Sequence, residues 1–235
     1  MQTIFFETIL RFLLILIVLS SAMIIRTSTL RILVKLYSFQ SLIIVLLAIV
    51  LYFDSKNILL IALAMLTLIS RVLLIPIIIN RNVDLLKIRR DIGFEYLSST
   101  TSIALSLFVI LIVYMSLSNL LEELSLDPLF MLGAIIGTSI AFMGLIVIFT
   151  RINVISDIIG YLTMENGVIL VSITLIEMPF IIEVLIVIDL FIIVLLSVIL
   201  AYGLENTISD FHSVLRLKRR TQKKSEFIQE VIRHA

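Results

Sequence analysis

Seven runs of apolar residues follow one another along the chain, with short polar segments between them. They cover residues 3–25, 32–53, 58–79, 100–121, 129–150, 152–175 and 179–202. A helix rises about 1.5 Å per residue, so a run of about 20 residues crosses the roughly 30 Å hydrocarbon core of a bilayer. The pattern therefore predicts an all-α, polytopic membrane protein with seven transmembrane helices.

Proline residues mark two ends and one interior point of these runs. Pro128 follows Asp127 before the fifth run, and Pro179 opens the seventh, as is typical of the first turn of a helix. Pro76 lies inside the third run, where its missing N–H and its ring predict a kink. The first run lacks a basic segment before it and a small-residue cleavage site, so we expect a retained helix and not a removed signal peptide.

The composition agrees with a membrane protein and excludes several kinds of chemistry. Hydrophobic residues make up 61% of the 235 residues, and charged residues only 15%. There is no cysteine, and His212 and His234 are the two histidines. These facts exclude disulfides, iron–sulfur clusters and Cys-zinc sites, and they argue against a histidine-bound metal or haem. Nucleotide-binding and nucleophile motifs are also missing, so we expect a non-catalytic chain without a cofactor.

Basic residues are divided unequally between the two ends of the predicted helices. Fifteen of the 18 Lys and Arg residues lie after the first, third, fifth or seventh run, counting Lys35 in the first turn of the second run. Lys56 alone lies on the opposite side, and Arg11 and Arg71 lie inside runs. Because loops rich in Lys and Arg stay in the cytoplasm, the pattern predicts a multi-pass protein of the cell (inner) membrane, with its N-terminus outside and its C-terminus in the cytoplasm.

The runs and the polar end of the chain divide it into three segments. Residues 1–121 hold four runs, residues 129–204 hold three, and residues 205–235 form a basic tail that we expect in the cytoplasm. Apolar residues of the tail keep helical spacing on either side of its basic residues. An amphipathic end of this kind either lies on the anionic inner leaflet or docks a soluble partner.

Two acidic residues lie deep inside neighbouring runs. By helical rise, Glu165 lies roughly 18 Å from the turn at Glu177, and Asp189 lies roughly 15 Å from Pro179. An ionisable group near the middle of a bilayer costs about 2.5–3.5 kcal/mol on insertion scales, so it marks a candidate functional site. We interpret both residues as groups on a proton or cation path. The alternative is that both are structural acids, hydrogen-bonded to neighbouring helices.

Four further charged residues have a predicted role. Arg71 lies deep in the third run and cannot lose its charge, so it needs an anion, either Glu165 or an acid on a partner subunit. Glu183 is a weaker path candidate, because it lies only about 6 Å by helical rise from the outer end of its run. Glu7 and Arg11 are four residues apart and predict a local ion pair.

Polar residues near Glu165 predict a row along one side of the sixth run. Tyr161 precedes Glu165 by four residues and Ser172 follows it by seven, so all three lie near one helix face. A polar row in a membrane helix faces protein or water rather than lipid.

Small residues recur at helical spacing in the fifth and sixth runs. Gly133, Gly137 and Ala141 form a stripe in the fifth, and Gly160 and Gly167 share a face in the sixth. Such stripes let two membrane helices approach closely. We interpret them as packing surfaces and not as substrate contacts.

The last three runs carry a recognisable motif. Residues 160–167 read Gly-Tyr-Leu-Thr-Met-Glu-Asn-Gly, and after a short turn residues 179–183 read Pro-Phe-Ile-Ile-Glu, with Asp189 further on. Over about residues 129–215 the chain resembles hydrogenase-4 component E, a membrane subunit of group 4 nickel-iron hydrogenase and formate hydrogenlyase complexes. The same region is similar, more distantly, to the three-helix K subunit of respiratory complex I and to the C subunit of Mrp-type cation/proton antiporters. In an alignment with the K subunit, its acid falls at Leu162, about one turn before Glu165.

The resemblance implies a subunit without a redox centre in a complex I-like assembly. Its partners would be antiporter-like and quinone-site-like membrane subunits, with hydrogenase-like subunits on the cytoplasmic side. Its own part would be a stretch of a proton or sodium route through Glu165 and Asp189, with Glu183 and Arg71 as further candidates. Two alternatives remain: a scaffold that only bridges its neighbours, and a stand-alone secondary cation transporter, which usually shows internal repeats and broken helices.

Overall fold

The regular elements that the structure describes are all helices. The structure is a computed structural model that describes residues 2–86, 99–123, 128–151 and 153–175. Its elements are α1 (Gln2–Arg26), α2 (Leu30–Ser55), α3 (Ile58–Thr67), a π-helix η1 (Leu68–Leu74), α4 (Ile75–Leu86), α5 (Ser99–Glu123), α6 (Pro128–Thr150) and α7 (Val154–Leu175). Six of the seven predicted runs therefore correspond to described helices. The seventh run, residues 179–202, lies outside the described residues, so the count of seven stays a prediction.

Among the described residues, five helices are long and apolar enough to cross a membrane. They are Phe6–Arg26, Leu30–Ser55, Ile58–Arg81, Ile103–Leu120 and Pro128–Thr150. The predicted helical, multi-pass character is therefore supported directly by the described part of the chain. Helix α7 is not one of the five, and it is the helix that carries Glu165 and Asn166 in its middle.

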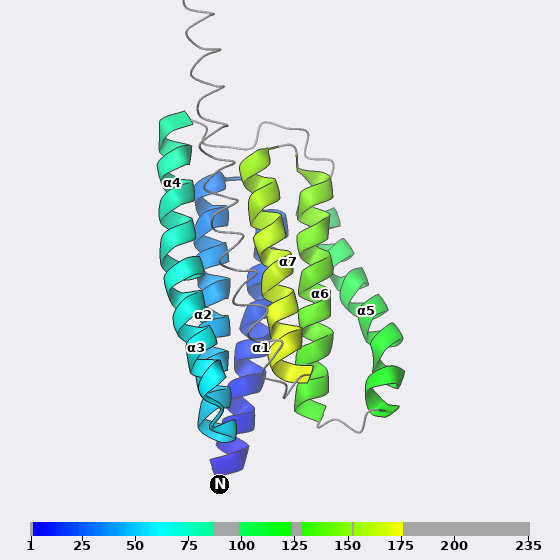
Figure 1. Cartoon of the computed structure of the whole chain (residues 1–235). Coiled ribbons are helices and arrows are strands. Elements are labelled where there is room, and N and C mark those ends of the chain that lie inside the picture. The colour runs from blue at the N-terminus through cyan, green and yellow to red at the C-terminus, as the bar shows by residue number, and fades with distance from the viewer. Residues whose placement is uncertain (1, 87–98, 124–127, 152, 176–235) are drawn as a thin grey trace, which may run out of the picture. The chain divides into compact units, whose positions relative to one another are not determined.

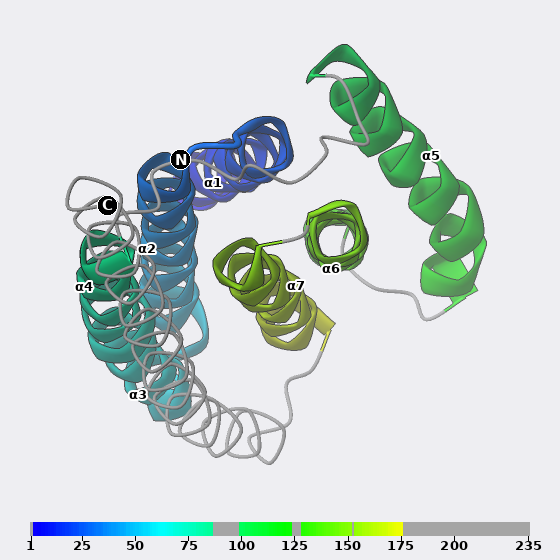
Figure 2. The ribbon, with the colours of Figure 1, turned by 90° about the horizontal axis from the view of Figure 1, so that it is seen from above.

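Helices run alternately in opposite directions through the bundle, with α3, η1 and α4 forming one rod (Figure 1). Seen from above, α1, α2 and the helix formed by α3 and α4 make an arc, and α7 lies on the inner side of that arc with α6 beside it (Figure 2). Helix α7 packs against α2 and α6, while α6 also contacts α1 and α5. These helices belong to one compact unit, residues 1–190, so the first four runs and the next two share one packed interior.

Helices α3, η1 and α4 continue one another without a break, as the cyan-to-teal rod of Figure 1 shows. Pro76 lies just inside α4, directly after the π-helical residues. At the end of the π-helix the N–H of Ile75 donates to the carbonyl of Ser70, five residues back instead of four. Because proline has no N–H and its ring presses on the preceding turn, it disfavours α-helical bonding there. The structure therefore has a π-helix at the place where the sequence predicted a kink.

Helices α6 and α7 pack backbone against backbone through their glycines. A Cβ at Gly137 would lie 2.8 Å from the carbonyl oxygen of Gly167, and a Cβ at Gly167 would lie 2.5 Å from the backbone nitrogen of Ala141. A Cβ at Gly144 would collide with the backbone of Met164. The prediction that these small residues support close packing is confirmed, and it is α6 and α7 that they bring together.

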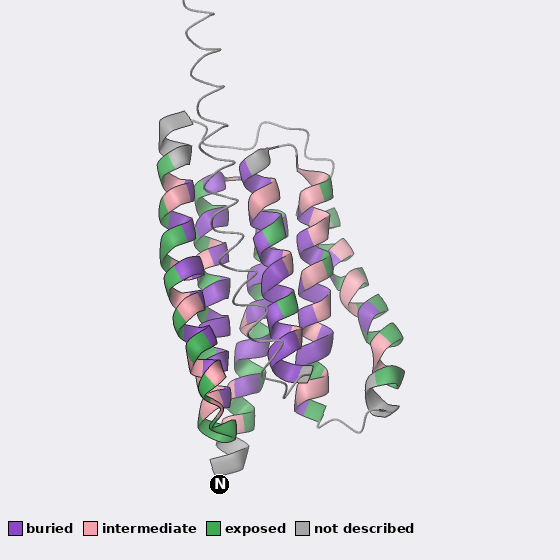
Figure 3. Ribbon diagram, in the orientation of Figure 1, coloured by how far each residue is buried: buried purple, intermediate pink, exposed green. Residues whose placement is uncertain are grey.

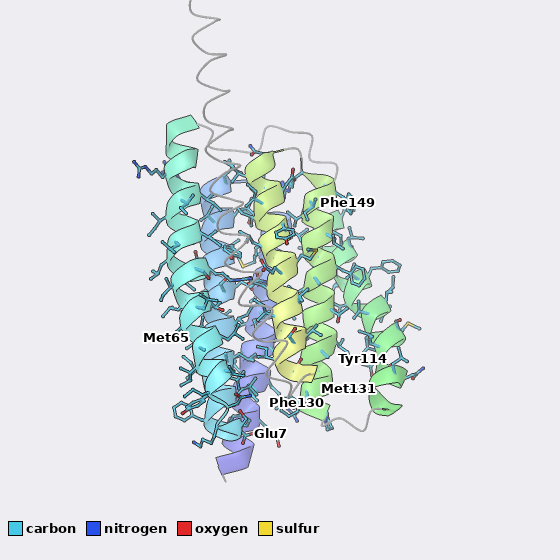
Figure 4. All side chains as sticks on the ribbon, in the orientation of Figure 1. Glu7, Met65, Tyr114, Phe130, Met131 and Phe149 are labelled. Carbon is cyan, nitrogen blue, oxygen red and sulfur yellow. The ribbon has the colours of Figure 1, made fainter. Side chains whose placement is uncertain are left out.

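The outward faces of the described helices are apolar. Figure 3 shows buried residues on the inner sides of the helices and exposed ones on the outer sides. Met65, Tyr114 and Phe149 point away from the bundle in Figure 4, and Met65 and Phe149 are 56% and 80% exposed. So many exposed apolar side chains are unusual on a soluble monomer, whereas the hydrocarbon of a bilayer covers such side chains.

Arg151 ties the end of α6 to the end of α1. Its Nη2 donates to the carbonyl oxygens of Ile25 (2.8 Å) and Thr27 (3.1 Å). A cation at the end of a helix satisfies carbonyl groups that have no partner within the helix and suits the negative end of the helix dipole. Two of the segments that the sequence assigned to one side of the membrane therefore meet at one end of the bundle.

Candidate functional site

An ion pair lies inside the bundle between the π-helix and α7. Nη2 of Arg71 is 2.8 Å from Oε1 of Glu165. Arg71 is completely buried and Glu165 is 5% exposed, so both charges lie away from solvent. Taking two charges out of water costs several kcal/mol each, and close pairing offsets this only with good geometry and further hydrogen bonds. The pair therefore needs further hydrogen bonds to be stable at this place in the bundle.

The further hydrogen bonds come from a chain of polar side chains that crosses to α2 and α1. Nη1 of Arg71 donates to Oδ1 of Asn166 at 2.7 Å, and Nδ2 of Asn166 donates to Oε1 of Gln40 at 3.2 Å. Nε2 of Gln40 donates to Oγ of Ser21 at 2.6 Å, and that hydroxyl donates to the carbonyl of Ile17 at 3.0 Å. Four helical segments, α1, α2, η1 and α7, are thus joined by one chain of contacts.

The direction of every bond in this chain follows from its charged end. Arg71 can only donate, so the group of Asn166 that faces it must be the carbonyl oxygen. The amide nitrogen of Asn166 must then donate to Gln40, which turns the amide nitrogen of Gln40 toward Ser21. The orientation of both amides is therefore set by hydrogen-bonding chemistry and does not depend on telling nitrogen from oxygen.

The ion pair lies near the middle of both helical segments. By helical rise, Arg71 lies about 20 Å from Ile58 and about 15 Å from Arg81, the ends of its span. Glu165 lies about 16 Å from Val154 and about 15 Å from Leu175. Both residues therefore lie near the middle of helical segments whose lengths are comparable to the roughly 30 Å core of a bilayer, where ionisable groups are rare and tend to serve substrate or ion pathways.

Two hydroxyl groups beside Arg71 are buried without a hydrogen-bond partner in the described part of the chain. They are Oγ1 of Thr67, the last residue of α3, and Oγ of Ser70, in the π-helix. Leaving a buried polar group unsatisfied costs about 1–3 kcal/mol. The two unsatisfied hydroxyl groups therefore lower the stability of the folded segment that carries Arg71.

The sequence-predicted site residues have different outcomes. Arg71 and Glu165 pair, which confirms the first of the two partners considered for Arg71. Asp189 and Glu183 lie outside the described residues, so their place relative to the pair stays a prediction. Glu7 and Arg11 form the expected pair at 3.5 Å, with both side chains exposed.

The predicted polar row on α7 is not a single buried surface. Tyr161 is 38% exposed, and the hydroxyl of Ser172 donates to the carbonyl of Val168 in its own helix. Helical spacing alone suggested the row, but Glu165 turns inward to the charge of Arg71, which is a stronger partner than either hydroxyl.

The sequence reading missed the amide and hydroxyl partners of the pair. They are Asn166, Gln40, Ser41 and Ser21. Two signals were available: Asn166 follows Glu165 directly in the motif, and Gln40 is a strongly polar residue inside an apolar run. Neither signal shows that the two residues meet, because the contact joins helices that are far apart in the sequence.

The described residues contain no group of three or more His, Cys, Asp or Glu side chains that could hold a metal ion. What the site offers instead is a carboxylate whose charge is balanced by one guanidinium. A proton or a sodium ion that reaches Glu165 would take over that balancing role and weaken the attachment of Arg71. The arrangement therefore suits the exchange of one positive charge for another.

Comparison with known proteins adds no further constraint: no family model, no curated protein and no solved structure matches the chain.

Proposed function

We propose that the chain is a membrane subunit of a complex I-like hydrogenase or oxidoreductase assembly and that it forms part of a proton or sodium path. Glu165 and Arg71 form the described portion of this path, and Asp189 and Glu183 continue it. The observation that carries the proposal is the buried ion pair near the middle of two long helical segments. The resemblance of the Met-Glu-Asn-Gly motif to hydrogenase-4 component E supports the type of assembly.

Stability alone is a weak reason for a buried ion pair. Hydrophobic side chains of similar volume at such a place are often neutral or stabilising by about 1–4 kcal/mol. A charged pair near the middle of the bilayer therefore favours a function that needs the charges. When a cation arrives at Glu165, Arg71 is released, and when the cation leaves, the pair forms again.

A scaffold role is the second candidate, and one observation favours it. Arg71 and Glu165 are joined to Asn166 and through it to Gln40, so the pair links α2, η1 and α7 within one chain. Such a link can hold the bundle in one arrangement while neighbouring subunits dock on its surface. A stand-alone secondary cation transporter is the third reading, since those proteins also interrupt helices near the bilayer midplane.

Purification and ion uptake test the proposal together. The tagged full-length chain, extracted in a mild detergent, should co-migrate with hydrogenase-like and antiporter-like subunits. A chain that transports ions as a monomer or homodimer would contradict this and support the transporter reading.

In proteoliposomes of the assembled complex, Glu165→Gln and Asp189→Asn keep the side-chain shape but remove the exchangeable charge. We expect each variant to lower the number of ions moved per electron several-fold, while electron transfer in the soluble subunits continues. Glu7→Gln is the matched control, because it makes the same change at an exposed local pair. If the number of ions moved per electron is unchanged in both Glu165→Gln and Asp189→Asn, the result supports the scaffold role instead.

A further inference from the structure

Arg71 contacts two acceptors of different chemistry on α7. Its Nη2 lies 2.8 Å from Oε1 of Glu165, and its Nη1 donates to Oδ1 of Asn166 at 2.7 Å. A carboxylate can take up a proton or another cation, whereas an amide oxygen does not titrate and accepts a hydrogen bond in either case. The contact with Glu165 therefore depends on the charge state of the carboxyl, and the contact with Asn166 does not.

The amide of Asn166 is held in place by groups other than Arg71. Its Nδ2 donates to Oε1 of Gln40 at 3.2 Å and to Oγ of Ser41 at 3.1 Å, and both residues lie on α2. Gln40 is held in turn by its bond to Ser21 of α1, at 2.6 Å. Because these bonds fix the amide nitrogen, the amide oxygen keeps its position if the guanidinium moves.

The backbone of α7 is also fixed beside Asn166. The next residue, Gly167, packs so closely on α6 that an added Cβ would lie 2.5 Å from the backbone nitrogen of Ala141. Such close packing leaves little room for one helix to move past the other. Arg71, in contrast, reaches α7 on a long and flexible side chain. If the ion pair opens, it is therefore the guanidinium that moves.

An opened ion pair needs another acceptor for the guanidinium. Arg71 is completely buried and cannot lose its proton, so it stays charged when Glu165 becomes neutral. A buried charge that loses its partners is strongly destabilising. Oδ1 of Asn166 is already within hydrogen-bond distance, so it can keep one directed bond to the guanidinium after the carboxylate charge has been lost.

We infer that Asn166 is a positioning residue that retains Arg71 when a cation displaces it from Glu165. In the paired state the guanidinium contacts both residues of α7. In the exchanged state it keeps the bond to Asn166 and gives up the contact with Glu165, so it stays close and returns when the cation leaves. The inference rests on the proposed function, since it assumes that Glu165 exchanges a cation, and it names the residue that makes the exchange reversible.

A purely structural amide would behave differently. If Asn166 only joined α2 to α7, its removal would loosen the site and make Glu165 easier to reach. If Asn166 retains Arg71, its removal takes away a bond that the exchanged state needs more than the paired state does, so the exchanged state becomes rarer. The two roles therefore predict opposite changes in how often the carboxyl of Glu165 is free of Arg71.

A carbodiimide measures how often that carboxyl is free. Dicyclohexylcarbodiimide enters membranes and adds to a protonated carboxyl, but not to a carboxylate paired with a guanidinium. The full-length chain is treated in its own membranes in sodium-free buffer, and mass spectrometry of its peptides gives the labelling rate at Glu165. We expect Asn166→Leu to slow this labelling several-fold. Thr163→Val should not change it, because Thr163 is buried on the same helix but donates to the carbonyl of Ile159 within that helix.

A second background tests whether Asn166 acts through Arg71. Arg71→Gln removes the charge that holds the carboxylate, so it should speed labelling at Glu165. In this background Asn166→Leu should have no further effect, because no guanidinium is left to retain. If Asn166→Leu does not accumulate in the membrane, Asn166→Ala replaces it, since the smaller side chain cannot force the helices apart.

Three results would overturn the inference. They are labelling of Asn166→Leu at the wild-type rate or faster, slowing that persists in the Arg71→Gln background, and no labelling of Glu165 in the wild type. The first two results remove the role of Asn166 and leave a path through Glu165 intact. Ion uptake by Glu165→Gln tests the proposed function separately, so the two failures are distinguishable.

An experimental structure of the Glu165→Gln variant tests the geometry directly. Glutamine resembles a protonated carboxyl in shape and carries no charge, so the variant imitates the exchanged state. We expect Nη1 of Arg71 to remain within hydrogen-bond distance of Oδ1 of Asn166. A guanidinium that has left Asn166 for acceptors on another helix would overturn the inference.

Discussion

Arg71 carries a positive charge that solvent does not reach, and it contacts two consecutive residues of α7. Glu165 balances the charge, and Asn166 accepts a second hydrogen bond. The planar guanidinium can meet both at once because its nitrogens form a fixed fork. A lysine at this place would keep the charge but lose one of the two directed contacts.

Replacing one member of the Arg71–Glu165 pair should lower the free energy of unfolding much more than replacing both members. Arg71→Leu leaves the carboxylate of Glu165 buried and uncompensated, so we expect it to lower the free energy of unfolding by about 3–5 kcal/mol. Arg71→Leu combined with Glu165→Leu leaves no uncompensated charge and should recover most of that loss. Unfolding of the detergent-solubilised protein measures both effects. A double variant as unstable as the sum of the two single variants would show that the two residues are not coupled.

The sequence allows the need for this pair to be predicted, but not its hydrogen-bonding shell. A guanidinium cannot shed its proton, so Arg71 inside an apolar run must have an anion, and Glu165 is at matching depth. Asn166 and Gln40 carry no charge and impose no such requirement. Their meeting depends on how α2 and α7 pack, which a single sequence does not encode in any local pattern.

At the scale of helices, the contact between α6 and α7 depends on glycine at particular turns. Gly144→Ala would drive a Cβ into the backbone of Met164, whereas the Cβ of Gly160→Ala would lie 3.0 Å from the carbonyl oxygen of Gly144. We expect the first change to lower stability by about 1–3 kcal/mol, and the second by less, because overpacking forces the helices apart. Phe149→Leu is the control, since that side chain is 80% exposed on the same helix. Thermal unfolding in detergent measures the stability of the three variants. Equal losses of stability in Gly144→Ala and Phe149→Leu would contradict the close packing of α6 and α7.

Apolar runs predicted the described helices well, because length and hydropathy are set by the thickness of the bilayer and not by tertiary contacts. The run 58–79 corresponds to the continuous helix Ile58–Leu86, and Pro128 opens α6 as expected. The π-helix was not predicted. An α-helix and a π-helix differ by one residue in their bonding, and the apolar pattern of Leu68–Leu74 suits both. Pro76 was the one sequence feature that predicted an irregular turn near this segment.

For the whole molecule, the order of helices along the chain does not predict which ones are neighbours in space. Helix α5 lies on the outer side of α6, and α7 fits inside the arc of α1, α2 and α3 (Figure 2). The closest pair, α6 and α7, was foreseeable from glycines in both runs, but the contact of α2 with α7 was not. In a bilayer every apolar face is equally compatible with lipid, so hydropathy cannot rank the possible neighbours.

Orientation in the membrane is a property of the whole molecule that charge does predict. Because the helices alternate in direction (Figure 1), the last turns of α1, α4 and α6 lie at one end of the bundle, and the turn between α2 and α3, which holds Lys56, lies at the other. The contact of Arg151 with Ile25 ties two of the basic segments together. A reporter fused after residue 220 should therefore be cytoplasmic, and one inserted in residues 122–127 should be external. Two reporters measure this: a phosphatase that is active only outside the cell and a fluorescent protein that fluoresces only inside it. At each site, one of the two reporters should give a signal and the other should not. If both readings are reversed at both sites, the bundle is inverted in the membrane.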